Sequence, residues 1–510
     1  MTIAIIRSDT VKCIKDGLSQ VFRNILRTLF GVGSPYNFRL GIYFPQLSRP
    51  LQCQLGFIVS DEQALKVMMQ FKGSSGTMCC ALCRNCVLVS SELDRQDRSL
   101  VNFAEHRLGR FSGQTDASVF QSVDYLSSQF GTTSKKEFSR MAQSLGFNHC
   151  SHGVLQDLAL RGFLKPVGNL MYDWMHCCLV QGVFPLEVNL MLQSLKFAGF
   201  SEVPLATFIE SCTFPAYISS RAVSGKGVLT RKTEGFHPSA SEALSLYPVI
   251  RLFVQDLLPT CSHQTFKDMV VSFFALCDFL DLLVGTMTAR PDVTADKLSF
   301  AASEHLRLFV KAHGAGNVIP KHHYNLHMGG HLRLRNILVN CFAHERHHKD
   351  VKKFANASSN VGPSFEKSLM KEMLVLQVHQ LETFAYHREG TVFFVEAVKP
   401  APRLIAEEVN TLFNQANLEV NTSLSISLVS GRTCRKGDVV LLLDNNVGKV
   451  LMHVNVGGGY LSLISLWESL GDNKFKTSRR NPEWRDSDTI RGCLIYIMDG
   501  DNVTVVPQEF

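Results

Sequence analysis

The sequence has 510 residues, more than one hydrophobic core usually organises, so two or three domains are expected. Hydrophobic residues make up 45% of the chain and charged residues 19%, a composition that excludes an intrinsically disordered or fibrous protein. The net charge of +7 permits an acidic partner but is too modest to indicate a nucleic-acid-binding protein by itself.

The compartment is predicted from the cysteines and the apolar runs. Fifteen cysteines are scattered along the chain and no secretory pattern precedes them, so we expect a nuclear or cytoplasmic protein. The most apolar segment, residues 269–287, carries Asp278 and Asp281 at helical spacing. It therefore predicts a buried helix and no membrane span.

The N-terminal part is predicted to alternate strands with helices. The expected strands are residues 1–6, 38–44 and 51–59, and the expected helices are residues 18–30 and 62–69. The last strand leads into Asp61, the place where RNase H-type polynucleotidyl transferases hold a metal-binding carboxylate. The same aspartate would serve as the N-cap of the helix that follows, so both roles are open.

A cysteine knuckle follows, in the segment KGSSGTMCCALCRNC. Cys80 and Cys83 have the CxxC spacing with which two thiolates bind one Zn²⁺, and Cys86 would offer a third thiolate. Buried thiols without metal are the alternative. His176 is a candidate further ligand that Asp173, three residues earlier on the same helix face, would orient; a hydrogen-bonded core histidine is the alternative.

Long helices are predicted from residue 154 onward, after short helices and loops over residues 91–151. Their ranges are residues 154–163, 174–183, 185–198, 241–258, 265–287, 294–312 and 364–385, with a basic loop over residues 214–238. Beyond residue 400, short β-rich runs separated by Gly and Asn predict a small module that is either barrel-like (SH3-like) or a rolled sheet. Its expected strands are residues 424–429, 438–444, 447–454, 460–467, 489–498 and 503–506.

The densest basic stretch runs over residues 319–354. Its Lys and Arg residues outnumber its acidic residues by five, so this stretch could follow a phosphate backbone. The candidate nucleic-acid contacts are Arg333, Arg335, Arg346, Lys349, Lys352 and Lys353. Four histidines could equally be scattered surface residues, and most of them are assigned no metal role: His322, His323, His327 and His331. Glu345 needs a cation among these residues, either an Arg in a plain salt bridge or Mg²⁺.

Taken in order, these motifs resemble the DDE transposases of the CACTA, Plavaka and KDZ groups of cut-and-paste DNA transposons. KGSSGTMCCALC after SDEQALKVM is similar to their acid, helix and CxxC segment, YDWMH to their DxxH element, and CFAHERHHK to the helix that carries their last acid. The resemblance covers about residues 18–385. It implies an α/β fold, in which a partial RNase H-like core is interrupted by a large all-helical insertion.

On this resemblance, Asp61 would be the second and Glu345 the third catalytic acid, and the acids would bind Mg²⁺ or Mn²⁺ for DNA strand cleavage and transfer. The zinc-associated or insertion-packing positions would be Cys80, Cys83, Asp173 and His176. The first acid has no clear counterpart, because no strand pair separates Asp9 from the first helix. The chain is therefore expected to be N-terminally truncated and inactive as an enzyme.

Four domains are expected. They are a partial RNase H-like core with the knuckle in residues 1–90, a mostly helical insertion in 91–315, the final-acid helix and C-terminal core helices in 316–395, and a β-rich module in 400–510. The leading hypothesis is a transposase-derived protein with DNA as its partner, a second copy of itself as a candidate partner, and no evident small-molecule substrate. The alternatives are a non-catalytic nucleic-acid or chromatin-binding scaffold, and a zinc-stabilised helical scaffold without a DNA role.

Overall fold

The chain divides into two compact units, and most of the boundaries between them fall inside long helices. The computed structural model describes residues 4–6, 8–34, 36–43, 45–197, 203–218, 229, 235–257, 259, 263–288, 290–357, 362, 364–383, 391–415, 417–477 and 482–508. Unit 1 comprises Met1–Leu186, Val271–Thr286 and Pro291–Leu376, and unit 2 comprises Glu187–Val270, Met287–Arg290 and Gln377–Phe510. Each unit therefore combines segments from more than one of the four ranges expected as domains.

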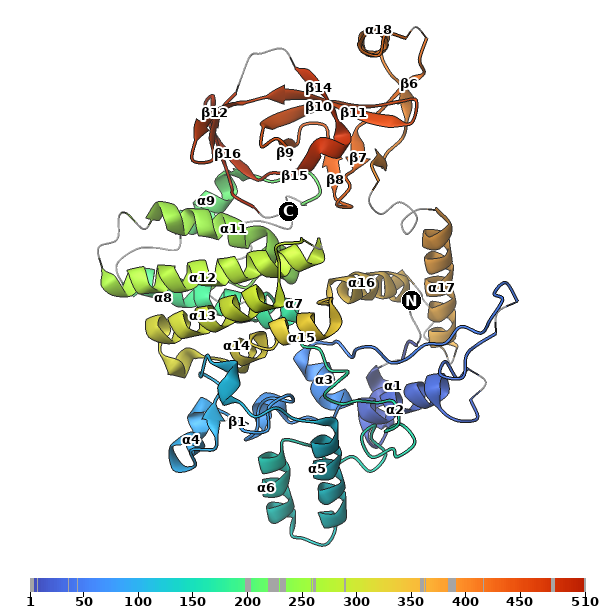
Figure 1. Ribbon diagram of the computed structural model, residues 1–510, viewed down its shortest axis with the longest axis vertical. Coiled ribbons are helices and arrows are strands. Elements are labelled where there is room, and N and C mark those ends of the chain that lie inside the picture. Colours follow the sequence, from blue (N-terminus) through green and yellow to red (C-terminus); the bar gives the residue numbers. More distant parts are fainter. Residues whose placement is uncertain are drawn as a thin grey trace. The chain divides into compact units, whose positions relative to one another are not determined.

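Unit 1 is mainly helical (Figure 1). Its helices are α1 (Ser8–Cys13), α2 (Gly17–Phe30), α3 (Glu62–Met68), α4 (Leu93–Gln96), α5 (Asp116–Gln129), α6 (Lys135–Leu145), α7 (Trp174–Cys178), α13 (Ala295–His313), α14 (Pro320–Asn325), α15 (Met328–Arg335) and α16 (Phe342–Ala357), with most of α12 (Gln264–Met287) and α17 (Phe365–Thr383). The strands β1 (Cys86–Val87) and β2 (Val101–Asn102) pair in parallel. These bounds confirm the helices predicted over residues 18–30, 62–69, 265–287 and 294–312.

The strands predicted near the N-terminus do not form a sheet in the residues described. Residues 1–3 lie outside that part of the chain, and residues 4–6 form no strand. The segments predicted as strands 38–44 and 51–59 form no strand in their described residues and have single bridges, from Ile42 to Leu51 and from Ile58 to Leu170. Leu40 and Tyr43 stay exposed, because no neighbouring strand covers them. An RNase H-like core requires a central sheet, and the described residues of unit 1 do not confirm one.

Residues 154–163, predicted as a helix, form consecutive turns around the buried carboxylate of Asp157. This carboxylate pairs with Arg27 of α2 and accepts a hydrogen bond from the backbone N–H of Ala159. Hydrogen bonds from the backbone to an aspartate side chain compete with helical ones, and a buried carboxylate needs a cation. The segment is therefore joined to α2 and does not continue as a helix.

The helix α15 packs closely on α13 at Gly329. A Cβ atom on Gly329 would lie 2.0 Å from the Ser299 hydroxyl oxygen and 2.5 Å from the Ala295 carbonyl oxygen, both on α13. No side chain fits at this approach. The contact fixes the start of α15, and with it the position of His327 immediately before the helix.

Unit 2 contains a helical part and a β-rich part. Its helices are α9 (Val203–Ser211), α11 (Ala240–Leu257), α18 (Arg403–Leu412) and most of α8 (Val183–Phe197). Leu192 of α8, Leu205 of α9 and Ile250 of α11 line a common apolar pocket. The helices predicted over residues 185–198 and 241–258 are confirmed in their described parts. Most of the predicted basic loop over residues 214–238 lies outside the described residues.

The strands of unit 2 pair antiparallel in three sheets. They are β3 (Cys212–Thr213), β4 (Phe393–Phe394), β5 (Lys399–Pro400), β6 (Val420–Ser423), β7 (Ser425–Ser427), β8 (Thr433–Arg435), β9 (Val439–Leu442), β10 (Val447–Val456), β11 (Gly459–Leu466), β12 (Glu468–Gly471), β13 (Lys474–Lys476), β14 (Glu483–Asp486), β15 (Ile490–Cys493), β16 (Tyr496–Asp499) and β17 (Asn502–Val505). A tight turn at Asn445, where φ is 66°, joins β9 to β10 as a hairpin.

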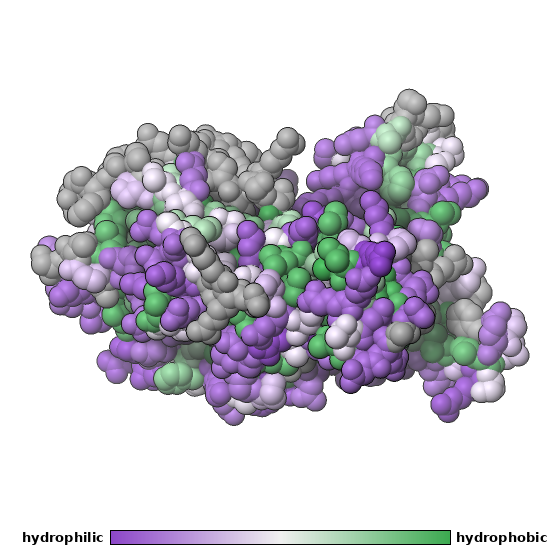
Figure 2. Space-filling view, turned by 90° about the horizontal axis from the view of Figure 1, so that it is seen from above, coloured by the Kyte–Doolittle hydropathy of each residue, from purple (hydrophilic) through white to green (hydrophobic). Residues whose placement is uncertain are grey.

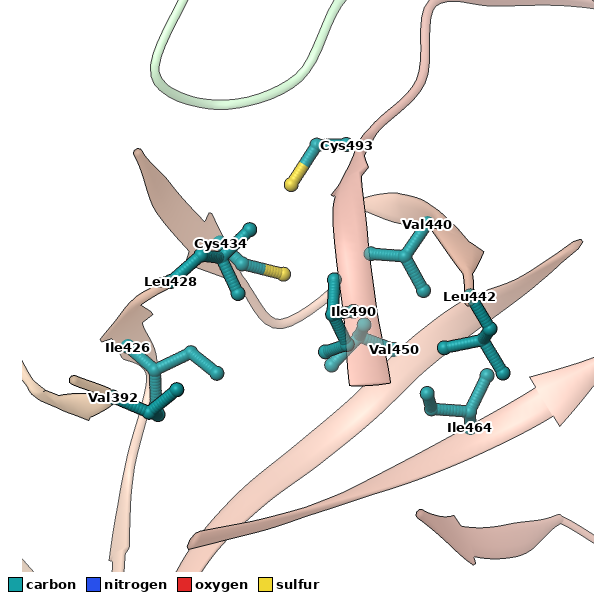
Figure 3. Close-up of a cluster of buried hydrophobic side chains, with 10 residues drawn as sticks. All are labelled: Val392, Ile426, Leu428, Cys434, Val440, Leu442, Val450, Ile464, Ile490 and Cys493. Atoms are coloured by element: carbon teal, nitrogen blue, oxygen red, sulfur yellow. The ribbon is translucent and has the colours of Figure 1, made fainter. Parts of the chain in front are cut away.

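The predicted β-rich module is confirmed, but of its two predicted forms the closed barrel is absent from the described strands. The largest sheet has the order β14-β11-β10-β6-β5, with β9 pairing to both β10 and β15. The other two have the orders β12-β13-β17-β16-β3 and β4-β7-β8. A barrel requires one sheet whose first and last strands pair, whereas these strands are divided among three open sheets. Buried apolar side chains such as Ile426, Val450 and Ile464 form a core between the strands (Figure 3).

Two described segments are long and apolar enough to cross a membrane, Trp174–Leu195 and Gln264–Met287. Their most apolar windows are 67% and 56% buried inside the protein, as in the core helices of soluble proteins, so they are weak evidence for a membrane span. The face in Figure 2 is largely hydrophilic, with hydrophobic side chains in separate patches.

Candidate metal centre

Four side chains from two distant parts of unit 1 meet at one point. Cys80 and Cys83 lie in the turn before β1, His323 lies on α14, and His327 lies directly before α15. One ligand atom from each residue falls within 4.8 Å of the others. Cys80, Cys83 and His323 are buried and His327 is partly buried. A Cys₂His₂ set of this kind could hold a metal ion such as zinc.

The separations of these atoms fit a tetrahedral zinc ion. The Nε2 atom of His327 lies 3.2 Å from Nε2 of His323, 3.4 Å from Sγ of Cys80 and 3.5 Å from Sγ of Cys83. With Zn–N near 2.05 Å and Zn–S near 2.3 Å, a tetrahedron has edges of about 3.3 Å between two nitrogens and about 3.6 Å between nitrogen and sulfur. The donor set and its spacing therefore suit Zn²⁺.

The electrostatics of the cluster favour a thiolate at Cys80. Burial by itself would raise the pKa of Cys80, but a hydrogen bond with Cys83 and the charges of His327 and His323 outweigh it and lower that pKa well below its usual value. Burial also lowers the pKa of His323. A thiolate and neutral imidazoles are the protonation states that bind a metal.

Two tyrosines hold the knuckle against α14. The hydroxyl of Tyr172 accepts a hydrogen bond from the Ala81 backbone N–H (3.1 Å) and lies 3.4 Å from Sγ of Cys80. The Tyr324 hydroxyl donates to the Cys79 carbonyl oxygen (2.9 Å). The two rings stack with their centroids 4.3 Å apart. These contacts position the cysteines without a metal, so the knuckle is pre-organised for one.

His323 and His327 were not identified as candidate ligands from the sequence, and the alternative that they are scattered surface residues is wrong. His323 is fully buried, against Phe111. The sequence signal that could have identified them is their HxxxH spacing. It would complete the CxxC pair from the other side of the helical block in the sequence. Cys86 does not join the four ligands; its Sγ lies 3.5 Å from Sγ of Cys79.

Asp173 and His176 lie in a separate cluster with Cys341, so they do not complete the knuckle. Asp173 is buried and caps α7, because it accepts hydrogen bonds from the backbone N–H groups of Met175 and His176. It also accepts one from the N–H of Cys341 (3.1 Å) and one from the His176 ring. The predicted contact between Asp173 and His176 is therefore present.

Both predicted catalytic acids are close enough to this cluster to act electrostatically on Cys341. The Glu345 carboxylate is 3.9 Å from Nε2 of His176. Burial raises the pKa of Cys341 well above its usual value, and the nearby carboxylates of Asp173, Asp61 and Glu345 raise it further. Asp61 is also the N-cap of α3, accepting from the Ala64 N–H at 2.7 Å. Its role as a cap is confirmed.

The six predicted nucleic-acid contacts differ in whether their side chains already bind another group of the protein. Arg333 pairs with Asp296, while Arg335 donates to the Gly168 carbonyl oxygen and lies over the Phe57 ring. The other four are exposed on α16 and form no ion pair with a described carboxylate: Arg346, Lys349, Lys352 and Lys353. Among the six predicted contacts, the four on α16 are therefore exposed and free of ion pairs with described carboxylates.

In comparisons with known proteins, no family model and no curated protein matches this chain.

Proposed function

We propose that this chain is a DNA-binding protein derived from a DDE transposase, with a residual catalytic centre. One observation carries the proposal: three motifs far apart in the sequence converge around Cys341. They contribute Asp61, Asp173 with His176, and Glu345. Three carboxylates near one buried thiol are unfavourable for stability alone, because like charges repel and the carboxylate of Asp173 is buried. Their gathering supports a site built for a divalent cation, Mg²⁺ or Mn²⁺ in this family.

Zinc would have a structural role next to this cluster. It would join the CxxC knuckle, which follows α3 and its cap Asp61, to the α14–α15 segment, which leads into α16 and Glu345. The metal would thus hold the two predicted acids on one framework. A closed four-ligand zinc site stabilises a fold and leaves no position for a substrate.

The exposed cations of α16 supply the DNA contact. Arg346, Lys349 and Lys353 follow each other at helical spacing on one face of this helix, and Glu345 begins the same stretch. A duplex following these cations would pass its phosphates beside the carboxylates. The contact reads the backbone and is not specific for sequence.

The test measures binding of the full chain to random-sequence duplex DNA by fluorescence anisotropy, between about 50 and 200 mM salt. The variant R346A/K349A/K353A is compared with K135A/K136A/R140A, which removes three exposed cations from α6 in the same unit. We expect the α16 variant to bind more weakly and its salt dependence to flatten by about 0.9 per lost phosphate contact, while the α6 variant binds like the parent. Equal behaviour of the two variants would reject the proposal.

A further inference from the structure

A second group of potential metal ligands lies in unit 2, at the end of the β-rich core. Cys434 is in the middle of β8, Cys493 ends β15, and Asp438 immediately precedes β9. The β15 strand pairs with β9, with Cys493 opposite Val440, so the sheet brings both elements together. The ligand atoms of the three residues lie within 4.8 Å of one another.

All three side chains are buried. Cys434 and Cys493 have no exposed surface and Asp438 is 7% exposed. Figure 3 shows the two thiols at one end of the apolar cluster, with their sulfur atoms turned toward the space between them. Two buried thiols alone would be ordinary core residues. The carboxylate beside them is what makes the group unusual.

The carboxylate of Asp438 is buried, and its partners among the described residues are two backbone N–H groups. No Lys, Arg or His side chain in the described part of the chain forms an ion pair with it. One oxygen accepts the backbone N–H of Ala216 (2.9 Å) and the other that of Arg435 (2.8 Å). Each oxygen keeps a second lone pair, and two neutral hydrogen bonds do not neutralise a buried carboxylate. A cation bound at the two thiols would neutralise the carboxylate.

We propose that Cys434, Cys493 and Asp438 bind a Zn²⁺ ion, with water as its fourth ligand. Two thiolates select a soft divalent metal over Mg²⁺ or Ca²⁺. Tetrahedral zinc places two thiolate sulfurs about 3.8 Å apart and a carboxylate oxygen slightly closer, within the spread of the three ligand atoms here. The amides of Ala216 and Arg435 would orient the carboxylate from outside the metal shell.

The ion would fasten β8, the β8–β9 turn and β15 together. It would also fix the segment after β3, because the Ala216 N–H is held by the same carboxylate. This segment comes from the helical part of unit 2, and β3 itself extends the sheet beyond β16. The site is independent of the knuckle ligands and of the proposed DNA contact.

The test is the zinc content of the full chain, purified without chelators and measured by elemental mass spectrometry. We expect two zinc ions per parent chain, one in the C80S/C83S variant, one in C434S, and none in the combination. The matched control is C212S, which removes another buried thiol of unit 2 outside the cluster and should keep both ions. A single zinc in the parent that disappears with C80S/C83S would overturn the proposal.

Two further measurements cover a C434S variant that fails to fold. Asp438→Asn keeps the size of the side chain, so we expect it to stay folded and to release one zinc to a competing chelator at least about tenfold more readily than the parent. Unchanged release would count against the site. Intact mass under non-reducing conditions should show Cys434 and Cys493 as thiols; a disulfide between them would overturn the proposal.

Discussion

The Nε2 atom of His327 lies within 3.5 Å of Nε2 of His323 and of the sulfurs of Cys80 and Cys83. One ring nitrogen makes a single hydrogen bond, as donor or as acceptor. Three polar neighbours at such distances are more than one nitrogen can serve by hydrogen bonding, and they fit the ligand set of a shared metal ion such as zinc. The relationship joins residues more than two hundred positions apart in the sequence.

The zinc ligands are separable from their neighbouring cysteines by mutation. Cys83→Ser is expected to remove the zinc of the knuckle, whereas Cys86→Ser should retain it, because Cys86 contacts Cys79 and not the four ligands. Elemental analysis of both variants measures this directly. Loss of zinc in C86S with retention in C83S would show that the ligand set is a different one.

The close contact of α15 with α13 predicts opposite effects for two adjacent glycines. Gly329→Ala is expected to lower the free energy of unfolding by about 1–3 kcal/mol, because its Cβ would collide with the Ala295 carbonyl oxygen. Gly330→Ala meets nothing within 4 Å and should stabilise the helix by about 0.5–1 kcal/mol. Chemical denaturation measures both. A stable G329A variant would mean that α15 shifts freely on α13.

The helices and the separate β-rich module are predictable from the sequence because they depend on local periodicity. The α2, α11, α12 and α13 helices agree with the prediction to within a residue or two of each end. The N-terminal strands are not predictable in this way. A strand needs a partner strand, and the single bridge from Ile58 to Leu170 depends on a segment far along the chain.

The candidate site was only half predictable for a related reason. CxxC is a local pattern, and Cys80 and Cys83 follow from it, as does the Asp61 cap. The partners His323 and His327 occur in a stretch with seven histidines, where spacing alone does not separate ligands from surface residues. Burial separates them, and burial follows from the packing of α14 and α15 on α13.

The β-rich module should lose stability in mild acid because of His453. This ring is fully buried, with Nδ1 2.8 Å from the Ser462 hydroxyl, and burial lowers the pKa of His453 to about 4 from 6.5. The stability that the neutral His453 contributes is therefore fully present above pH 6.5 and is lost as the pH falls to about 4. The loss in the free energy of unfolding is about 3 kcal/mol in total.

The free energy of unfolding of the parent, measured between pH 7 and about 4, tests this. His453→Gln should make that free energy depend less on pH. His152→Gln, at an exposed position, serves as the control and should show the same pH dependence as the parent. An unchanged profile in H453Q would assign the acid sensitivity to other groups.

We expect no DNA cleavage by this chain in Mg²⁺ or Mn²⁺. The chemistry needs three carboxylates to hold two metal ions, and the first of the three acids has no clear candidate among the described residues. The second candidate, Asp61, also serves as the cap of α3. A nicking assay on supercoiled plasmid measures activity. Metal-dependent nicking that disappears in both D61N and E345Q would contradict this prediction.

Asp173 is expected to act mainly as a structural cap, which its substitution can distinguish from metal binding. Asp173→Ala removes the cap of α7, worth about 0.5–2 kcal/mol, and leaves the Cys341 N–H buried without an acceptor, worth about 1–3 kcal/mol. Glu345→Gln changes a side chain that is 38% exposed and should alter stability by less than about 0.5 kcal/mol. Urea denaturation of both variants, with and without Mn²⁺, separates the roles. If Mn²⁺ raises the free energy of unfolding of the parent and of D173A equally but not that of E345Q, Glu345 holds the cation. If Mn²⁺ stabilises the parent and E345Q but not D173A, Asp173 is a metal ligand and the cap assignment is wrong.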